Sequence, residues 1–215
     1  MRESVASKRA RAAVIVERLK QAYPNSKCSL DFRTPFQLLV ATMLSAQCTD
    51  ERVNMVTPVL FSRFPDAKAM AAAPVEVIAE IIRSTGFFNS KSKNISNMAK
   101  TVMAEYGGEI PLNMDKLVKF PGVGRKTANV LLGTGFGVPG IVVDTHVTRI
   151  TNLLELTREK DAVKIERDLE KVLEQDEWIL FTHLIIDHGR AVCKARRPRC
   201  GECVLNDLCP SARGI

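Results

Sequence analysis

The spacing of apolar residues is the feature that most limits the fold of this chain. In almost every segment apolar residues recur three or four positions apart, the period of a helix buried on one face. Only Ile141–Val143 is β-like in composition, and three residues do not make a sheet. The sequence therefore predicts an all-α fold of about ten helices with short connections. The clearest expected helices are Lys8–Ala22, Thr34–Asp50, Pro74–Thr85, Asn89–Tyr106, Glu159–Gln175 and Asp176–Val192.

Length and charge narrow the class of protein. The chain has 215 residues and a net charge of +7, which fits one large domain or two smaller ones and permits a polyanionic partner. No apolar run approaches the roughly 18 residues of a membrane span. The apolar patch Ala12–Val16 is too short for a secretory signal peptide. We expect a monomer in the reducing cytoplasm, with no membrane partner.

Four cysteines lie close together near the C-terminus. Cys193, Cys200, Cys203 and Cys209 have the spacing C-x6-C-x2-C-x5-C, which requires a compact loop around a central group. Disulfides are disfavoured in a reducing compartment. Structural zinc usually takes two short C-x2–4-C pairs, and only Cys200 and Cys203 form one here. Iron–sulfur clusters accept this spacing more readily, but the spacing leaves both metals open.

Basic residues are interleaved with these cysteines, among them Lys194 and Arg197. A loop held rigid by a metal loses little entropy on binding, so its cations suit phosphate contacts. A solvated charged loop is the alternative. We expect Lys194 and Arg197 to contact a nucleic-acid backbone.

A second motif lies at Pro121–Gly124, where PGVG joins two helical segments. The amides of Gly122, Val123 and Gly124 precede a helix N-terminus, where glycines allow a phosphate oxygen to approach closely. An ordinary helical hairpin is the alternative, but the cation Arg125 that follows favours phosphate binding. The motif indicates a helix–hairpin–helix that contacts DNA backbone without reading base sequence.

Lys126 follows in the first turn of the second hairpin helix. The helix dipole and Arg125 both disfavour its charged form, as an amine nucleophile requires. From the residues alone, a nucleophile and a phosphate contact are equally plausible roles. Asp144 occupies a helix N-cap position, where a carboxylate caps the helix and can also assist Lys126.

Several motifs now occur together in a fixed order. They are LSAQ at Leu44–Gln47 with Thr49 and Asp50, Gly86 followed by Asn89–Lys91, PGVGRKTAN at Pro121–Asn129, VDTH at Val143–His146, and the four-cysteine loop. In this combination the chain resembles the endonuclease III family, bifunctional DNA glycosylases and abasic-site lyases of the helix–hairpin–helix superfamily. The similarity extends from about residue 8 to Cys209.

The resemblance implies two α-helical domains flanking a DNA-binding cleft. One is a six-helix barrel at residues 28–138, with the helix–hairpin–helix at about 114–136. The other is a cluster domain made of residues 1–27 and 139–215, in which the four cysteines of loop 193–209 hold a [4Fe–4S] cluster. The implied partner is double-stranded DNA with damaged pyrimidines, such as thymine glycol, or abasic sites.

The resemblance also assigns roles to single residues. By similarity Lys126 is the nucleophile and Asp144 the essential carboxylate. Gln47 matches the residue that fills the gap left by an extruded nucleotide, and Phe87 stands at a second wedge position that is usually leucine. The matched motif segments also place Asn89 and Lys91 among the expected DNA contacts.

Three other interpretations compete with this one. An adenine-specific sister enzyme shares the hairpin and the cluster, but it lacks the lysine and has a further C-terminal domain; Lys126 and the end of this chain at Ile215 disfavour it. A non-catalytic DNA-binding protein would use the same hairpin. A ferredoxin-like electron carrier is disfavoured by the positive charge.

Overall fold

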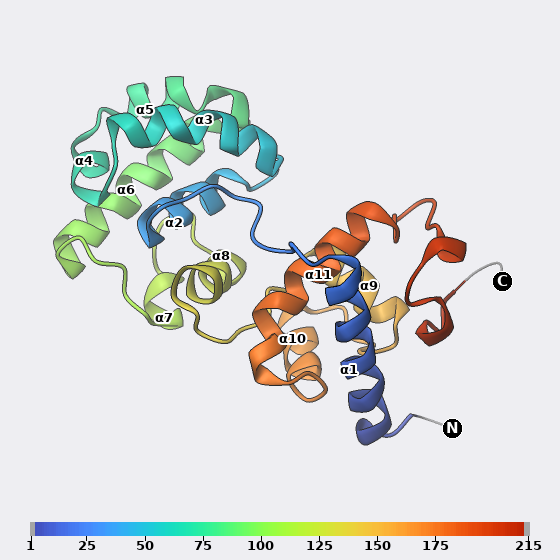
Figure 1. The fold of residues 1–215 in the computed structure, drawn as a ribbon. Helices are drawn as coiled ribbons and strands as arrows, with labels where there is room; N and C mark the ends of the chain where they lie inside the picture. The colour runs from blue at the N-terminus through green and yellow to red at the C-terminus, as the bar shows by residue number, and fades with distance from the viewer. Residues whose placement is uncertain (1–2, 213–215) are drawn as a thin grey trace. The chain divides into compact units, whose positions relative to one another are not determined.

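The computed structural model describes residues 3–212 (Figure 1). All regular structure within this range is helical, which confirms the predicted all-α class. None of the helices described there is long and apolar enough to cross a membrane. The α-helices are α1 (Val5–Ala22), α2 (Pro35–Leu44), α3 (Asp50–Arg63), α4 (Ala67–Ala72), α5 (Val75–Ile81), α6 (Phe88–Tyr106), α7 (Met114–Leu117), α8 (Arg125–Val130), α9 (Thr145–Leu153), α10 (Ala162–Glu170) and α11 (Trp178–Ala191).

The chain divides into two compact units. The central unit is Cys28–Val138, and the terminal unit combines Met1–Lys27 with Pro139–Ile215. Each unit has its own cluster of buried apolar side chains. Each unit is therefore built around a hydrophobic core of its own.

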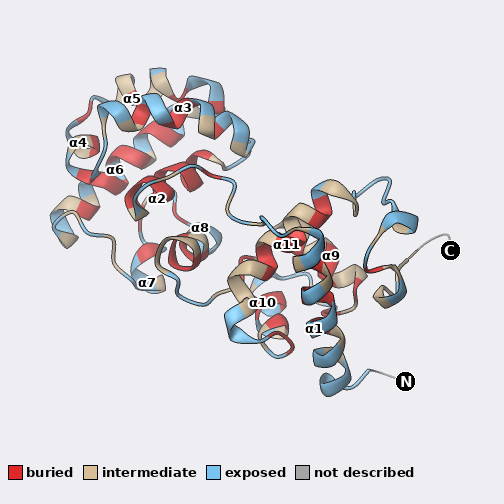
Figure 2. Ribbon diagram, in the orientation of Figure 1, coloured by how far each residue is buried: buried red, intermediate tan, exposed pale blue. Residues whose placement is uncertain are grey.

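Helix α2 is the centre of the central unit. Every residue from Phe36 to Leu44 is buried, and Figure 2 shows α2 buried along its length. Helices α6 and α8 pack against it. A short helix that is apolar on all faces needs neighbours all around it, so burial of α2 contributes much of this core.

The terminal unit joins the two ends of the chain. Helix α1 packs against α11, and Figure 1 shows the blue α1 close to the red C-terminal segment. Arg18 forms an ion pair with Asp207 at 2.5 Å, and Arg11 Nη1 donates to the carbonyl oxygen of Leu154 at 2.7 Å. The N-terminal helix therefore helps to support the cysteine-containing loop.

Local sequence signals explain most helix starts, but one helix ends early. Thr34 caps α2 by accepting from the Gln37 amide, and Pro35 opens its first turn. The expected helix over Thr34–Asp50 ends at Leu44, and the left-handed backbone of Gln47, with φ of 53°, prevents it from continuing to Asp50. A second departure from a regular α-helix lies directly after α8, where Leu131–Gly135 form a π-helical turn. Such turns are frequent at functional sites.

Candidate functional site

The hairpin of the central unit joins α7 to α8. Gly122 has a φ of 76°, a conformation that residues with a β-carbon rarely adopt. Gly122 and Gly124 are exposed. Among residues 3–212, their two amides have no hydrogen-bond acceptor. Two open amides beside a helix N-terminus suit an anion such as a phosphate oxygen.

Val123 differs from its glycine neighbours. Its amide donates to the carbonyl oxygen of Phe120 at 3.0 Å, and its side chain is 5% exposed. The amide therefore closes the turn instead of pointing to a ligand. The expectation of a DNA contact from Val123 is corrected: this residue stabilises the hairpin that presents Gly122 and Gly124.

Lys126 and Arg125 both lie in the first turn of α8, and both are exposed. Within the central unit, the amine of Lys126 has no hydrogen-bond or ion-pair partner. A side chain with this freedom can reach a reacting carbon without first breaking an interaction.

Asp144 caps helix α9 in the terminal unit. Its Oδ1 accepts from the amides of His146 and Val147 at 2.8 and 2.9 Å. The N-cap prediction is therefore confirmed. Oδ2 lies 3.4 Å from Nδ1 of His146, and the side chain is 12% exposed. One oxygen fixes the carboxylate in place while the other has no backbone donor.

Gln47 and Phe87 line one pocket in the central unit. It measures about 240 Å³, and its lining also includes Lys91, Asn94 and Gly122. Both Gln47 and Phe87 are exposed and have left-handed backbones. Asn89, at the start of α6, is exposed as well. The structure thus brings the two expected wedge residues to the same surface as the hairpin.

Lys91 is buried and does not present its amine at this surface. It is 7% exposed, and its Nζ donates to the carbonyl oxygens of Leu44 and Thr85, both at 2.8 Å. Removal from water lowers its pKa. The expectation that Lys91 contacts DNA directly is corrected, because its ammonium is already committed to two backbone carbonyls.

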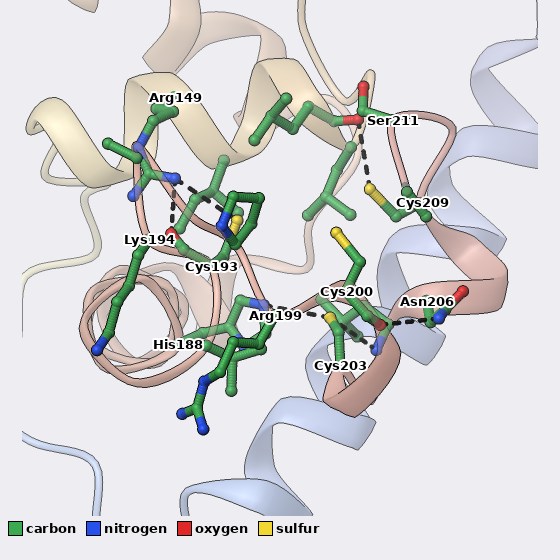
Figure 3. A pocket seen from close by; sticks show the side chains of 18 of the residues that line it. Arg149, His188, Cys193, Lys194, Arg199, Cys200, Cys203, Asn206, Cys209 and Ser211 are labelled. Carbon is green, nitrogen blue, oxygen red and sulfur yellow. Dashed lines mark hydrogen bonds between the residues drawn. The ribbon is translucent and has the colours of Figure 1, made fainter. Parts of the chain in front are cut away.

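The four cysteines line a single pocket of about 180 Å³ in the terminal unit (Figure 3). Among residues 3–212, no three His, Cys, Asp or Glu side chains are arranged to hold one metal ion. A zinc ion requires its four sulfurs about 2.3 Å from one point. A pocket with sulfur on several sides and room for more than one atom fits a polynuclear cluster better.

Two residues beside this pocket were missed in the sequence. Arg149 of α9 donates from Nη1 to the carbonyl oxygen of Cys193 at 2.7 Å. His188 lies with Nε2 3.5 Å from Sγ of Cys203, and its Nδ1 pairs with the hydroxyl of Tyr23 at 3.0 Å. The sequence offered no clear signal for Arg149, because α9 (THVTRITNL) is rich in polar residues and one more cation does not stand out.

The basic residues of the loop have the expected exposure. Lys194 and Arg197 are exposed between Cys193 and Cys200. Lys194 also borders a second pocket, which Arg190, Arg149 and His146 line. The loop therefore presents positive charge at its surface, as a polyanion-binding element requires.

Two family models match the chain. The model described as "HhH-GPD superfamily base excision DNA repair protein" matches residues 40–175. The model described as "Iron-sulfur binding domain of endonuclease III" matches residues 193–209, the four-cysteine loop.

Curated relatives and solved structures agree with these matches. Endonuclease III of Synechocystis sp. is 55% identical over 210 residues, covering 97% of this chain and 96% of the relative. The Escherichia coli K12 protein of the same name is 40% identical and covers 94% and 95%. A structure of a trapped endonuclease III–DNA covalent intermediate is 39% identical, with a TM-score of 0.89 over 95% of this chain and 96% of that one.

Proposed function

Because the chain belongs to the endonuclease III family of HhH-GPD base excision repair proteins, we propose that Lys126 is its nucleophile and Asp144 its assisting carboxylate. The protein is a DNA glycosylase with an associated lyase activity at abasic sites, and it carries a [4Fe–4S] cluster. Its substrates are damaged pyrimidines in duplex DNA, thymine glycol among them. The relatives are bacterial proteins, and we assign this chain to the cytoplasm, acting on nucleoid DNA as a monomer.

A damaged base inside a duplex is out of reach of an amine on a helix, so the nucleotide must leave the stack. Extrusion costs a few kcal/mol, and less for a damaged base. The side chains of Gln47 and Phe87 fill the gap. The amides of Gly122 and Gly124, with Arg125, hold the backbone phosphates, and Asn89 adds a polar contact at the same surface.

The observation that carries the proposal is the position of Lys126. Its amine has no partner in its own unit, and it lies one residue into the helix that follows the phosphate-binding turn. A phosphate held by the hairpin brings the adjoining sugar near this amine. Proximity of this kind supplies much of the rate gain in enzymatic reactions.

The reaction forms a bond from Lys126 Nζ to C1′ of the sugar and breaks the bond from C1′ to the base. The ring opens to a Schiff base, which acidifies the 2′ proton. Loss of that proton and cleavage of the C3′–O bond complete β-elimination on the 3′ side. Oδ2 of Asp144 stabilises the developing positive charge and accepts a proton, while Oδ1 remains bonded to the cap amides.

The [4Fe–4S] cluster supports DNA binding in this proposal. Cys193, Cys200, Cys203 and Cys209 hold it, and when bound it supplies rigidity to a loop that has almost no core of its own. Lys194 and Arg197 on this loop then contact phosphates with little ordering entropy left to lose.

Reductive trapping tests the nucleophile. Borohydride reduces a Schiff base to a stable amine, so the wild-type protein is expected to become covalently linked to duplex DNA with an abasic site. Lys126→Gln is expected to abolish the link and the strand cleavage while DNA binding stays within about threefold, since binding depends on the phosphate contacts. Lys119→Gln, an exposed lysine before the hairpin, serves as the matched control and should trap normally.

Added metal ions are not needed for these steps, so cleavage should persist in EDTA. Cleavage of abasic DNA by Lys126→Gln would show that the nucleophile is a different residue. A strict requirement for added Mg²⁺ would contradict the Schiff-base route altogether.

A further inference from the structure

Lys91 is a buried cation whose two acceptors lie at the ends of two different helical segments. Its Nζ donates to the carbonyl oxygens of Leu44 and Thr85, both at 2.8 Å. Leu44 is the last residue of α2, and Thr85 ends the 3₁₀ turn Arg83–Thr85. The last carbonyls of a helix lack intrahelical donors, so the ammonium satisfies a group that would otherwise be left unpaired in the core.

Each acceptor lies just before one of the wedge residues. Leu44 precedes Gln47 by three positions, and Thr85 precedes Phe87 by two. Lys91 itself is attached to the second loop, because its backbone amide donates to the carbonyl oxygen of Phe87 at 2.9 Å. A single side chain therefore ties together the two segments that carry Gln47 and Phe87.

Both wedge residues have backbones that need such support. The φ angles are 53° for Gln47 and 48° for Phe87, in the left-handed region that side chains with a β-carbon disfavour. Residues persist there only when the surrounding structure fixes them. Neither loop has a glycine at the wedge position itself, so the fixing must come from contacts such as those of Lys91.

Helix α6, which carries Lys91, also contacts the hairpin. Asn94, one turn after Lys91, packs against Gly122, where an added β-carbon would lie 2.9 Å from Asn94 Nδ2. Lys91, Asn94, Gln47, Phe87 and Gly122 all line the same pocket. Burial of the ammonium lowers the pKa of Lys91, a penalty that a lysine on a solvated phosphate-binding surface would avoid.

We propose that Lys91 is a positioning residue that holds Gln47 and Phe87 in the geometry needed to fill the gap left by the extruded nucleotide. The assignment rests on the proposed function, because it presumes that these two side chains enter DNA. Lys91 itself touches neither the DNA nor the reacting atoms. Its effect is on extrusion and on the choice of the opposite base, and not on Schiff-base chemistry.

The test replaces the ammonium and keeps the buried stem. Lys91→Met is expected to lower single-turnover excision from duplex DNA by roughly 10- to 100-fold, since a displacement of about 1 Å has effects of this size. The lesion is placed opposite each of the four bases in turn. Because Gln47 and Phe87 are displaced, the four rates should change by different factors. Lys93→Met, an exposed lysine two residues along α6, is the control and should change each rate less than about twofold.

A mutant cycle separates positioning from general damage. If Lys91 acts through the wedge residues, Lys91→Met should change the rate by less than about threefold in a Gln47→Ala/Phe87→Ala background, because the effects of residues that act together are not additive. The proposal would be overturned if Lys91→Met lowered the excision rate in that background by the same factor as it does in the wild-type protein. An equal loss opposite all four bases would do the same, since that is the result of simple destabilisation.

A second variant and a second signal keep the test decisive. If Lys91→Met does not fold, Lys91→Gln takes its place, because a shorter amide keeps a donor in the core but reaches only one of the two carbonyls. Extrusion is followed by the fluorescence of a 2-aminopurine placed next to an abasic site, in a Lys126→Gln background. The fluorescence signal does not depend on cleavage, so it tests the role of Lys91 independently of whether Lys126 is the nucleophile. If the fluorescence rise were unchanged in the Lys91 variant, the positioning role alone would be refuted.

Discussion

The side-chain amide of Asn94 occupies the space in which Gly122 would carry a β-carbon. The distance from that position to Asn94 Nδ2 is 2.9 Å, shorter than real side chains tolerate. Gly122 also has a φ of 76°. Two independent constraints therefore require glycine here, one from the backbone and one from packing between α6 and the hairpin.

Gly122→Ala should therefore lower stability. We expect about 1–2 kcal/mol from the left-handed backbone, plus the displacement of Asn94, and a fall in melting temperature of roughly 2–4 °C per kcal/mol. The matched control is Gly124→Ala, where φ is −93° and no atom lies within 4 Å of the added carbon. Thermal denaturation should distinguish the two variants, and equal melting temperatures would contradict the constraint. Both variants should weaken DNA binding, because Gly124→Ala adds a methyl group at the open surface of the turn, and Gly122→Ala shifts the turn by displacing Asn94.

Asp144 combines a structural and a chemical role, and one substitution separates them. Asparagine caps helices as well as aspartate does, so Asp144→Asn should leave the melting temperature nearly unchanged. It removes the carboxylate, and cleavage should fall by about 10²- to 10⁴-fold, the range of general acid–base contributions. Asp144→Ala should lose the same activity and also about 1 kcal/mol of stability. Single-turnover cleavage and thermal denaturation measure the two effects; wild-type cleavage by Asp144→Asn would leave only the capping role.

Local signals made the helix starts and the caps predictable. Thr34 and Asp144 satisfy amides two or three residues away, so the adjoining sequence contains all that is needed. The place of Lys126 and Arg125 in the first turn of α8 was likewise available from the hairpin motif. The all-α class follows from the same short-range periodicity.

Contacts between distant segments were not predictable in this way. The early end of α2 and the burial of Lys91 are linked, since Lys91 reaches a carbonyl 47 residues away in the sequence. Because Lys91 follows the polar residues Asn89 and Ser90 in the sequence, we expected it at the surface. Its two carbonyl acceptors lie in other segments of the chain, and only the folded structure brings them to it. The Val123 amide was misassigned for a related reason: sequence alone does not reveal that it closes the turn to Phe120.

Loss of the cluster should release the C-terminal loop. Leu205 is the only buried residue between Cys193 and Cys209, so little else holds that range. In Cys203→Ser, purified without full iron, we expect trypsin to cut after Lys194, Arg196 and Arg199, which are exposed. The slope of log affinity against log salt should fall by about 1 for each phosphate that the loop no longer binds. Cys28→Ser, which lies in the central unit, should keep its iron, its salt slope and its protease resistance; an equally resistant Cys203→Ser loop would contradict the structural role.

Phe87 has a strained left-handed backbone, and its bulky ring is the side chain that we expect to enter DNA. It is 67% exposed, has a φ of 48°, and precedes α6 at the N-cap without a side-chain cap. Glycine adopts this backbone without strain and is an acceptable N-cap residue. Phe87→Gly should therefore keep the unfolding free energy or raise it by about 1 kcal/mol.

The same substitution should impair repair. A ring stacked on a base contributes about 1–3 kcal/mol, so Phe87→Gly should bind abasic duplex roughly tenfold or more weakly. Phe87→Leu should restore part of the affinity through bulk alone. Because a flat ring stacks best on the larger bases, Phe87→Leu should also reduce the ratio of excision rates opposite purines to those opposite pyrimidines. Unfolding in urea measures the change in stability, and excision rates opposite each base measure the change in repair. A variant that lost stability and kept the wild-type ratio would show that Phe87 is a packing residue and not a wedge.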